Sequence, residues 1–333
     1  MKIDRNICIV AEIGSVHDGS FGNACNLIEA AARAGADMVK FQTHLPESET
    51  LPDAPTPSYF KNEPRMEYFK RTGFSLSQWK DLARQAKDCD VEFVSSPFSI
   101  EAVELLEEVG VSTYKIASGE VTNLPLLERI TKTKKPVFLS SGMSSWSELD
   151  TAVDTLKKGG PLTVMQCSST YPCPPEEVGL NVILEMQERY KVPIGFSDHT
   201  LGFAAAIGAA TLGATVIEKH FTFSRLMYGS DAKHSMEPDE FNILVSAIHE
   251  VELMQKKPVD KSDISKYRTM KLIFEKSIVT TCPVSKGTVL KNEHLAYKKP
   301  GDGISAAQYQ NILGKRTSRD LPKDYKIKKE DLL

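Results

Sequence analysis

Apolar runs typical of buried strands alternate eight times with helical segments between Ile7 and Gln255. Most of these runs end in polar residues, and the helical segments space their apolar residues along one helix face. Eight strands that are each followed by a helix form the pattern of a (β/α)₈ TIM barrel, whose usual length is about 250 residues. The alternation therefore predicts an α/β protein with a TIM barrel in this part of the chain.

The expected strands and helices can be placed by residue number. We expect strands at residues 7–14, 37–43, 91–98, 111–120, 136–143, 162–172, 193–200 and 213–222. We expect helices at residues 23–36, 75–89, 100–110, 124–132, 146–158, 181–190 and 238–255, and one between the last two strands. The long segment 44–72 contains five prolines and is typical of a functional loop. An open doubly wound sheet is the main alternative, but no glycine-rich phosphate loop follows the first strand.

The residues after the barrel form a different unit. We predict a barrel domain over residues 1–255, a polar, lysine-rich linker over 256–271 and a small domain over 272–333. Within the small domain, VSKGTVLKNEHL (284–295) is echoed by LPKDYKIKKEDL (321–332) at the lysines, the glutamate and the final leucine. Two copies of one strand–turn–helix element predict a pseudo-symmetric, β-rich module. Because such a module buries little apolar surface by itself, we expect it to dock on another surface.

Composition excludes several classes of partner. The chain has 333 residues, of which 41% are hydrophobic and 26% charged, and its net charge is -3. This composition is globular and lacks the basic character of a nucleic-acid-binding protein. No apolar run approaches the length of a membrane span, and the N-terminus lacks the apolar core of a signal peptide. The six cysteines form no C-x-x-C pair and are interpreted as reduced thiols, so we expect a cytoplasmic protein without nucleic-acid or membrane partners.

Two histidines stand at the ends of the last two expected strands. Because side chains alternate along a strand, His199 shares a face with Ser197, and His220 shares a face with Glu218. Neighbouring strands can then aim two imidazoles at one point, and neutral imidazole is the commonest side-chain ligand of metals. A carboxylate near each histidine, Asp198 and Glu218, favours a metal site. Two hydrogen-bonded core histidines are the alternative that the spacing leaves open.

The active site of a TIM barrel lies at the carboxyl ends of its strands. The polar residues at these ends are Glu12, Lys40, Gln42, Ser96, Lys115, Ser118, Glu120, Ser140, Ser168, Tyr171, Ser197, His199, Glu218 and His220. Lysine is rare within an apolar strand without an anionic partner, and one such lysine is more often half of a structural ion pair. Two converging lysines with a row of hydroxyls instead indicate a site for a phosphate and a carboxylate. With a metal, this set suggests carbon–carbon bond formation or phosphoryl chemistry.

A set of segments in fixed order carries a resemblance to a known family. The segments are AEIGSVHDGS, VKFQTH, SSPFS, YKIASGE, LSSGM, CSSTYPCPPEEVGLN, GFSDHT and EKHFT. In this order they resemble the sialic acid synthase family. The segment KKPGDGI, residues 298–304, resembles the C-terminal antifreeze-like (SAF, β-clip) domain of that family. The resemblance covers nearly the whole chain and implies a TIM barrel followed by a small, β-rich SAF domain.

The resemblance implies a transferase of the N-acetylneuraminate synthase type that forms a carbon–carbon bond. Such enzymes condense phosphoenolpyruvate with an N-acylated hexosamine of the N-acetylmannosamine type, giving a nine-carbon, sialic-acid-type 2-keto acid and phosphate. A precursor of legionaminic or pseudaminic acid is the alternative sugar. The family needs a divalent metal ion, usually Mn²⁺, with Mg²⁺ or Co²⁺ as alternatives. It also forms homodimers in which the SAF domain caps the partner's active site.

The resemblance also implies roles for residues of this chain. His199 and His220 match the metal ligands, and Asp231 completes this site and is counted with the substrate-binding residues. The positions that match the phosphoenolpyruvate site are Lys40, Ser96, Lys115, Ser118, Ser140 and Ser197. The positions that match the surroundings of the sugar are Glu12, Gln42 and Tyr171. Glu120 matches the residue that activates water, and it is counted with Glu12 and the two histidines as catalytic.

Two residues depart from the family pattern. Ser169 stands where the neuraminate enzymes carry asparagine beside the phosphate, and Lys299 stands where the SAF domain usually offers arginine to the N-acyl end of the sugar. Lysine lacks the planar fork of arginine, so the sequence leaves the identity of the sugar open. Two other functions also stay open, namely another metal-dependent barrel aldolase and a carbohydrate-binding protein without catalysis.

Overall fold

The computed structural model describes residues 6–55 and 63–333. The chain divides into two compact units, Met1–Lys257 and Pro258–Leu333. The first unit ends close to the predicted limit of the barrel domain at residue 255. The predicted linker 256–271 is not wholly irregular, because helix α11, Arg268–Phe274, begins within it.

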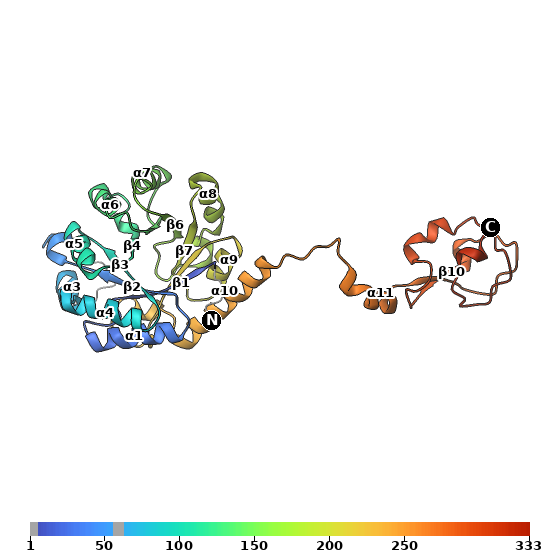
Figure 1. Ribbon diagram of the computed structural model, residues 1–333, viewed down its shortest axis with the longest axis horizontal. Coiled ribbons are helices and arrows are strands. Elements are labelled where there is room, and N and C mark those ends of the chain that lie inside the picture. The colour runs from blue at the N-terminus through green and yellow to red at the C-terminus, as the bar shows by residue number, and fades with distance from the viewer. Residues whose placement is uncertain (1–5, 56–62) are drawn as a thin grey trace. The chain divides into compact units, whose positions relative to one another are not determined.

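Eight parallel strands close into a barrel in the first unit, in the order β1 to β8 (Figure 1). The strands are β1 Cys8–Gly14, β2 Met38–Thr43, β3 Glu92–Pro97, β4 Thr113–Ile116, β5 Val137–Ser140, β6 Leu162–Cys167, β7 Ile194–Asp198 and β8 Val216–His220. The ring closes because β8 pairs with β1, which places Glu12 opposite His220. The predicted TIM barrel is confirmed.

Helices cover the outside of the barrel (Figure 1). They are α1 Phe21–Arg33, α2 Pro46–Glu49, α3 Arg65–Thr72, α4 Leu76–Asp88, α5 Ile100–Val109, α6 Leu124–Thr131, α7 Trp146–Leu156, α8 Leu180–Tyr190, α9 Ala204–Thr211 and α10 Pro238–Lys256. Helix α1 begins earlier than predicted because the side chain of Ser20 caps it. The long segment 44–72 contains α2 and α3, and its residues 56–62 lie outside the described residues. Within the described ranges, no helix combines the length and apolar character needed to cross a membrane.

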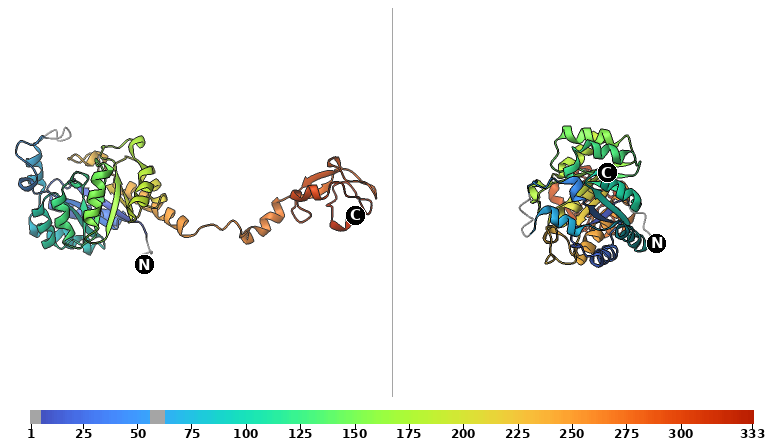
Figure 2. Two further views of the ribbon diagram at one scale, coloured as in Figure 1. Left: turned by 90° about the horizontal axis from the view of Figure 1, so that it is seen from above. Right: turned by 90° about the vertical axis from the view of Figure 1, so that its left-hand side faces the viewer.

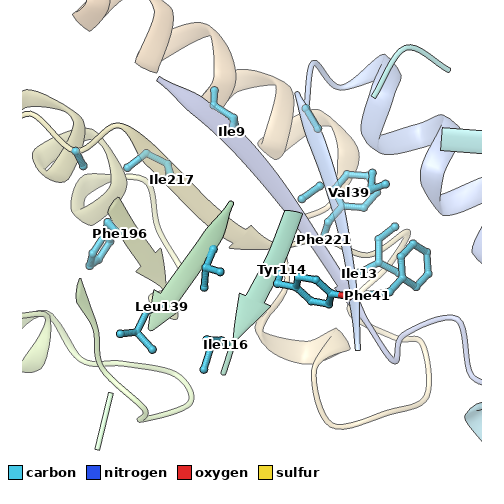
Figure 3. Packing of buried hydrophobic residues seen from close by; sticks show 14 of the residues in the cluster. Ile9, Ile13, Val39, Phe41, Tyr114, Ile116, Leu139, Phe196, Ile217 and Phe221 are labelled. Carbon is cyan, nitrogen blue, oxygen red and sulfur yellow. The ribbon is translucent and has the colours of Figure 1, made fainter. Parts of the chain in front are cut away.

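Side chains of the strands form an outer and an inner layer. The outward-facing residues pack against the helices, and Figure 3 labels among them Ile9, Val39, Leu139, Phe196 and Ile217. The inward-facing apolar layer consists of Val10, Phe138, Met165 and Val216. Along β1 the next inward position after Val10 is Glu12, because side chains alternate along a strand. A polar layer therefore lies directly on the carboxyl side of the apolar one.

The C-terminal unit, coloured orange to red in Figure 2, contains an antiparallel sheet of β9 Ser277–Thr280 and β10 Leu295–Lys298. The predicted internal echo is visible in its backbone. Val284 and Leu321, which are equivalent positions of the two copies, exchange both backbone hydrogen bonds at 2.8 Å. The core of this unit consists of Ile278, Val284, Leu290, Leu295, Ile312, Leu321 and Ile327. The predicted small, β-rich unit is confirmed.

Candidate active site

A connected group of polar side chains, all buried except the half-buried Gln42, fills the carboxyl end of the barrel. Its members are Glu12, Lys40, Gln42, Ser96, Lys115, Ser197 and Glu218. Lys40 Nζ lies 2.8 Å from Glu12 Oε2, and Lys115 Nζ lies 2.9 Å and 3.0 Å from the two carboxylate oxygens of Glu218. Lys40 also donates to Ser96 at 3.4 Å. The structure thus brings together six of the predicted site residues around Glu218.

Both lysines of this group already have a carboxylate partner. Burial alone would raise the pKa of Glu218, but the positive charges of Lys115 and Lys40 outweigh it and lower this pKa to about 2. Burial alone would lower the pKa of Lys40, and the charges of Glu12 and Glu218 raise it instead. The centre therefore holds ion pairs, and an anionic substrate must share these lysines with the two carboxylates.

His199 and His220 lie side by side, with ring centroids 5.5 Å apart. Nδ1 of His199 donates to the carbonyl of Ser168 at 2.7 Å, so in the neutral ring Nε2 carries the lone pair, which faces the Tyr171 hydroxyl at 2.9 Å. Nδ1 of His220 is buried and has no hydrogen-bond partner among the described residues. Burial lowers the pKa of His220, which favours the neutral ring. Burial acts in the same direction on His199, but the charge of Cys167 and its hydrogen bond outweigh burial and raise the pKa of His199. A metal ion would bind the neutral form of both rings.

Asp198 does not face the histidines, so the expectation that it lies near His199 as a supporting carboxylate is wrong. Its side chain accepts a hydrogen bond from Lys219 Nζ at 2.8 Å. Lys219 is 1% exposed and also donates to the carbonyl oxygens of Thr200 and Gly202. Each residue of this pair directly precedes a histidine, and alternation turns it to the opposite face of its strand. The pair joins the ends of β7 and β8 behind the two histidines.

We expect Lys219→Ala to lower the free energy of unfolding by about 3–5 kcal/mol, because it leaves Asp198 buried without its counterion. Chemical denaturation of the purified variant measures this loss. The matched control is Arg84→Ala, which breaks an exposed pair with Asp81 on α4 and should cost about 1 kcal/mol or less. Equal losses in the two variants would show that the buried Asp198–Lys219 pair contributes no more to the free energy of unfolding than an exposed pair.

Hydroxyl groups from the ends of two strands, β4 and β6, meet at Gly142, which follows β5. A side chain at position 142 would collide with the hydroxyls of Ser118 and Ser169, so glycine provides the room between them. The hydroxyl of Ser140 is buried and lacks a hydrogen-bond partner within the part of the chain that the structure describes. These hydroxyls can donate to an anion bound beside them.

Glu12, Gln42 and Asp231 converge on Gly14, the last residue of β1. A Cβ atom at this position would lie 3.0 Å from Asp231 Oδ2, 3.4 Å from Glu12 Oε1 and 3.5 Å from Gln42 Nε2. Gly14 also has a φ of +52°, which glycine adopts without steric cost. Three side chains predicted to serve the substrates therefore border one point at the end of β1.

Glu120 and Lys299 lie in different surroundings. Glu120 ends a 3-10 turn after β4, and its carboxylate accepts a hydrogen bond from Asn123 Nδ2 at 2.7 Å. Burial raises the pKa of Glu120, and the hydrogen bond from Asn123 opposes this shift. Lys299 belongs to the C-terminal unit, where its Nζ lies 5.0 Å from the ring centroid of Phe274.

The site also contains a residue that sequence reasoning does not single out. His44 follows β2 directly and contacts Gln42. It stands at a strand end within the segment VKFQTH, which was the available signal. Its partner Glu49 lies on α2, in a segment where the sequence predicts a loop, so this contact could not be foreseen.

Comparison with known families decides the identity of the chain. The NeuB family model matches residues 27–260, and the SAF domain model matches residues 275–333. The chain belongs to the NeuB family. This result confirms the predicted family and its SAF domain.

Relatives of this NeuB-family chain are named as synthases. The chain is 35% identical to the N,N'-diacetyllegionaminic acid synthase of Campylobacter jejuni, over 97% of this chain and 99% of the relative. It is 32% identical to the N-acetylneuraminate-9-phosphate synthase of Homo sapiens, over 97% of this chain and 91% of the relative. The solved structure of an N-acetylneuraminic acid synthetase from Leptospira borgpetersenii matches with a TM-score of 0.72 at 30% identity. The match covers 80% of this chain and 90% of the synthetase chain. The chain is therefore an enzyme of the sialic acid synthase family.

Proposed function

We propose that this enzyme condenses phosphoenolpyruvate with an N-acylated hexosamine of the N-acetylmannosamine type, giving a nine-carbon 2-keto acid and phosphate. The observation that carries the proposal is the pair His199 and His220 beside two buried lysines at the carboxyl end of a NeuB-family barrel. This set combines groups for a metal, for an anion and for a polar sugar in one place.

The site offers matching groups for both charged ends of phosphoenolpyruvate. Lys40 and Lys115 supply two buried positive charges, and lysine binds phosphate as a point charge. The hydroxyls of Ser96 and Ser197 belong to the same buried group, and we assign those of Ser118, Ser140 and Ser169 to the same anion. We assign the sugar to the other side, at Gly14, where Glu12 and Asp231 can accept from sugar hydroxyls and Gln42 can donate.

The two histidines fit a divalent metal ion, for which we propose Mn²⁺, with Mg²⁺ or Co²⁺ as alternatives. His220 keeps a buried ring nitrogen without a partner in the described ranges, and a backbone carbonyl orients His199, as is usual for metal-binding histidine. Across residues 6–55 and 63–333, no three His, Cys, Asp or Glu side chains gather closely enough to hold an ion. Water or substrate oxygens would complete the site, with Asp231 acting through water. A bound ion would polarise the sugar aldehyde as a Lewis acid.

The chemistry requires one proton acceptor for water. C3 of phosphoenolpyruvate bonds to the aldehyde carbon of the open-chain sugar, and the aldehyde oxygen takes up a proton. Water adds at C2 and gives one proton to Glu120. The C2–O bond to phosphate then breaks, and the second proton of the water leaves with the phosphate, so that the 2-keto group remains. The pKa of Glu120, raised by burial, moves toward the working pH of such a base.

A legionaminic acid precursor is the second candidate for the sugar. It is favoured by the 35% identity to the N,N'-diacetyllegionaminic acid synthase, which spans nearly both chains. Ser169 and Lys299, which depart from the neuraminate pattern, stand at positions assigned to the phosphate and the N-acyl group. The second candidate changes the acceptor and keeps the reaction.

Phosphate release from phosphoenolpyruvate, screened across a panel of N-acylated sugars, tests the proposal. We expect release with N-acetylmannosamine or with a legionaminic acid precursor, and the faster sugar identifies the acceptor. An ordinary aldolase would release no phosphate, and a carbohydrate-binding protein would bind sugars without turnover. No release with any sugar of the panel, in the presence of Mn²⁺, would overturn the proposed function.

We also propose a homodimer in which the C-terminal unit caps the partner's barrel. Side chains at Gly14 can read sugar hydroxyls, but they offer little for an N-acyl group. Lys299 is exposed, and the C-terminal unit is rich in lysine although the whole chain has a net charge of -3. The barrel unit therefore carries the excess of negative charge. Opposite charges favour docking of the C-terminal unit of one subunit on the barrel of the partner subunit.

Lys299→Ala should raise the sugar KM about 10- to 100-fold, as expected for the loss of a charged hydrogen bond, and change the phosphoenolpyruvate KM much less. Lys299→Arg should alter the ranking of the acyl sugars, because a planar fork replaces a point charge. Steady-state kinetics on the sugar panel measures both effects. Lys298→Ala, which removes the neighbouring exposed lysine and its pair with Asp324, is the control. A monomer in solution with full activity would contradict the cap.

A further inference from the structure

His44, the residue directly after β2, is buried between two aromatic rings. Its ring centroid lies 3.6 Å from that of Phe69 on α3 and 4.0 Å from that of Phe98 after β3, with interplanar angles of 22° and 14°. His44 is 8% exposed. Because both faces of the imidazole are covered, its nitrogens can form hydrogen bonds only in the plane of the ring. The two rings therefore fix the directions in which His44 can bond.

Each nitrogen of His44 faces an oxygen that accepts hydrogen bonds. Nδ1 lies 2.7 Å from Oε1 of Glu49, and Nε2 lies 3.2 Å from Oε1 of Gln42. The other end of the Gln42 amide, Nε2, donates to Glu12 Oε1 at 2.7 Å. Carboxylate oxygens only accept, so the bonds run in one direction, from His44 through Gln42 to Glu12.

This chain of bonds is complete when both nitrogens of His44 carry hydrogen. Burial lowers the pKa of His44 despite the opposing hydrogen bond to Glu49, so the chain to Gln42 depends on the hydrogen at Nε2, while Nδ1 and Glu49 share the other. The second carboxylate oxygen of Glu49 accepts from the backbone of Leu45 at 3.3 Å, which holds this counterion in place. Without an N–H from His44, the Gln42 amide could turn over, and its oxygen would then meet the carboxylate of Glu12.

We propose that His44 is a positioning residue for the acceptor sugar, which fixes the Gln42 amide so that its NH₂ group faces Glu12 and the point at Gly14. The inference rests on the proposed function, which assigns Glu12 and Gln42 to the sugar. His44 acts through Gln42 and not on the reacting atoms. Its loss should therefore change the sugar KM and leave kcat and the phosphoenolpyruvate KM nearly unchanged.

Two substitutions separate positioning from packing. In His44→Gln the amide nitrogen replaces Nε2, whereas in His44→Asn it replaces Nδ1 and cannot reach Gln42. We expect His44→Asn to raise the sugar KM about 3- to 10-fold, the effect of one lost hydrogen bond, while His44→Gln stays within about twofold of wild type. A residue that only anchored Glu49 would give the opposite order. That order, or equal losses, would overturn the proposal.

Two controls confine the effect to Gln42. In a Gln42→Ala background, His44→Asn should cause no further rise in the sugar KM, because the group it positions is gone. His17→Asn tests the general cost of changing a buried histidine. His17 also contacts two phenyl rings, Phe41 and Phe74, but its Nδ1 accepts from the backbone of Gly19. The sugar KM of His17→Asn should match that of wild type, and a rise equal to that of His44→Asn would overturn the proposal.

The hydrogen bond can also be measured without turnover. In labelled protein, the side-chain amide protons of Gln42 should exchange slowly with solvent in wild type and in His44→Gln, and faster in His44→Asn. Equal exchange in the three proteins would overturn the positioning role. Absence of phosphate release by wild type with every sugar would overturn the proposed function instead, and the exchange rates would still decide whether His44 fixes Gln42.

Discussion

Alanine in place of His199 or His220 should abolish phosphate release from phosphoenolpyruvate while leaving the barrel folded. Each substitution removes one of the two imidazoles that lie with ring centroids 5.5 Å apart. The strands that carry them stay joined by their backbone pairing and by the buried Asp198–Lys219 pair. Kinetic assays measure the loss of turnover, and circular dichroism checks that the fold is kept.

Removal of the metal should reproduce this loss in wild type. A chelator should silence the enzyme, and added Mn²⁺ should restore it. Calorimetric titration with Mn²⁺ measures binding directly, and both alanine variants should bind far more weakly than wild type. His249→Ala, on helix α10, is the control and should bind Mn²⁺ as wild type does. Full activity in chelator-treated, metal-free wild type would show that the reaction needs no such ion.

The barrel could be predicted from the sequence because its signals are local. Each apolar run and each helical segment can be recognised within about ten residues, and alternation along a strand assigns faces without knowledge of its neighbours. Glu12 and His220, predicted to face inward from the first and last strands, stand opposite each other in the closed barrel. Helix ends were less accurate, because they depend on single capping side chains such as Ser20.

The partners of the site residues could be predicted only in part. The sequence indicates that Lys115 points inward, but its partner Glu218 lies 103 residues away, and only the closed barrel brings them together. The sequence places Asp198 next to His199 and so predicts that it supports the histidines, although alternation along the strand turns its side chain toward Lys219. His44 depends on Glu49 and Phe69, which belong to short helices in a segment that the sequence predicts as a loop. Contacts that depend on tertiary packing therefore lie beyond local patterns.

Glu120→Gln should lower kcat by about 10²–10⁴-fold, the usual contribution of a general base, with little change in the affinity for phosphoenolpyruvate. The substitution preserves the shape of the side chain, and Asn123 Nδ2 can still donate to its carbonyl oxygen. In wild type the rate should rise with pH through a pKa that burial places above the ordinary value of glutamate, because only the ionised form accepts a proton. In the variant, the fall in rate at low pH, which is the acid limb of the pH–rate profile, should disappear. Pre-steady-state and pH–rate measurements test both effects, with Glu128→Gln on α6 as the control. Near-normal turnover with an unchanged acid limb would show that another group accepts the proton.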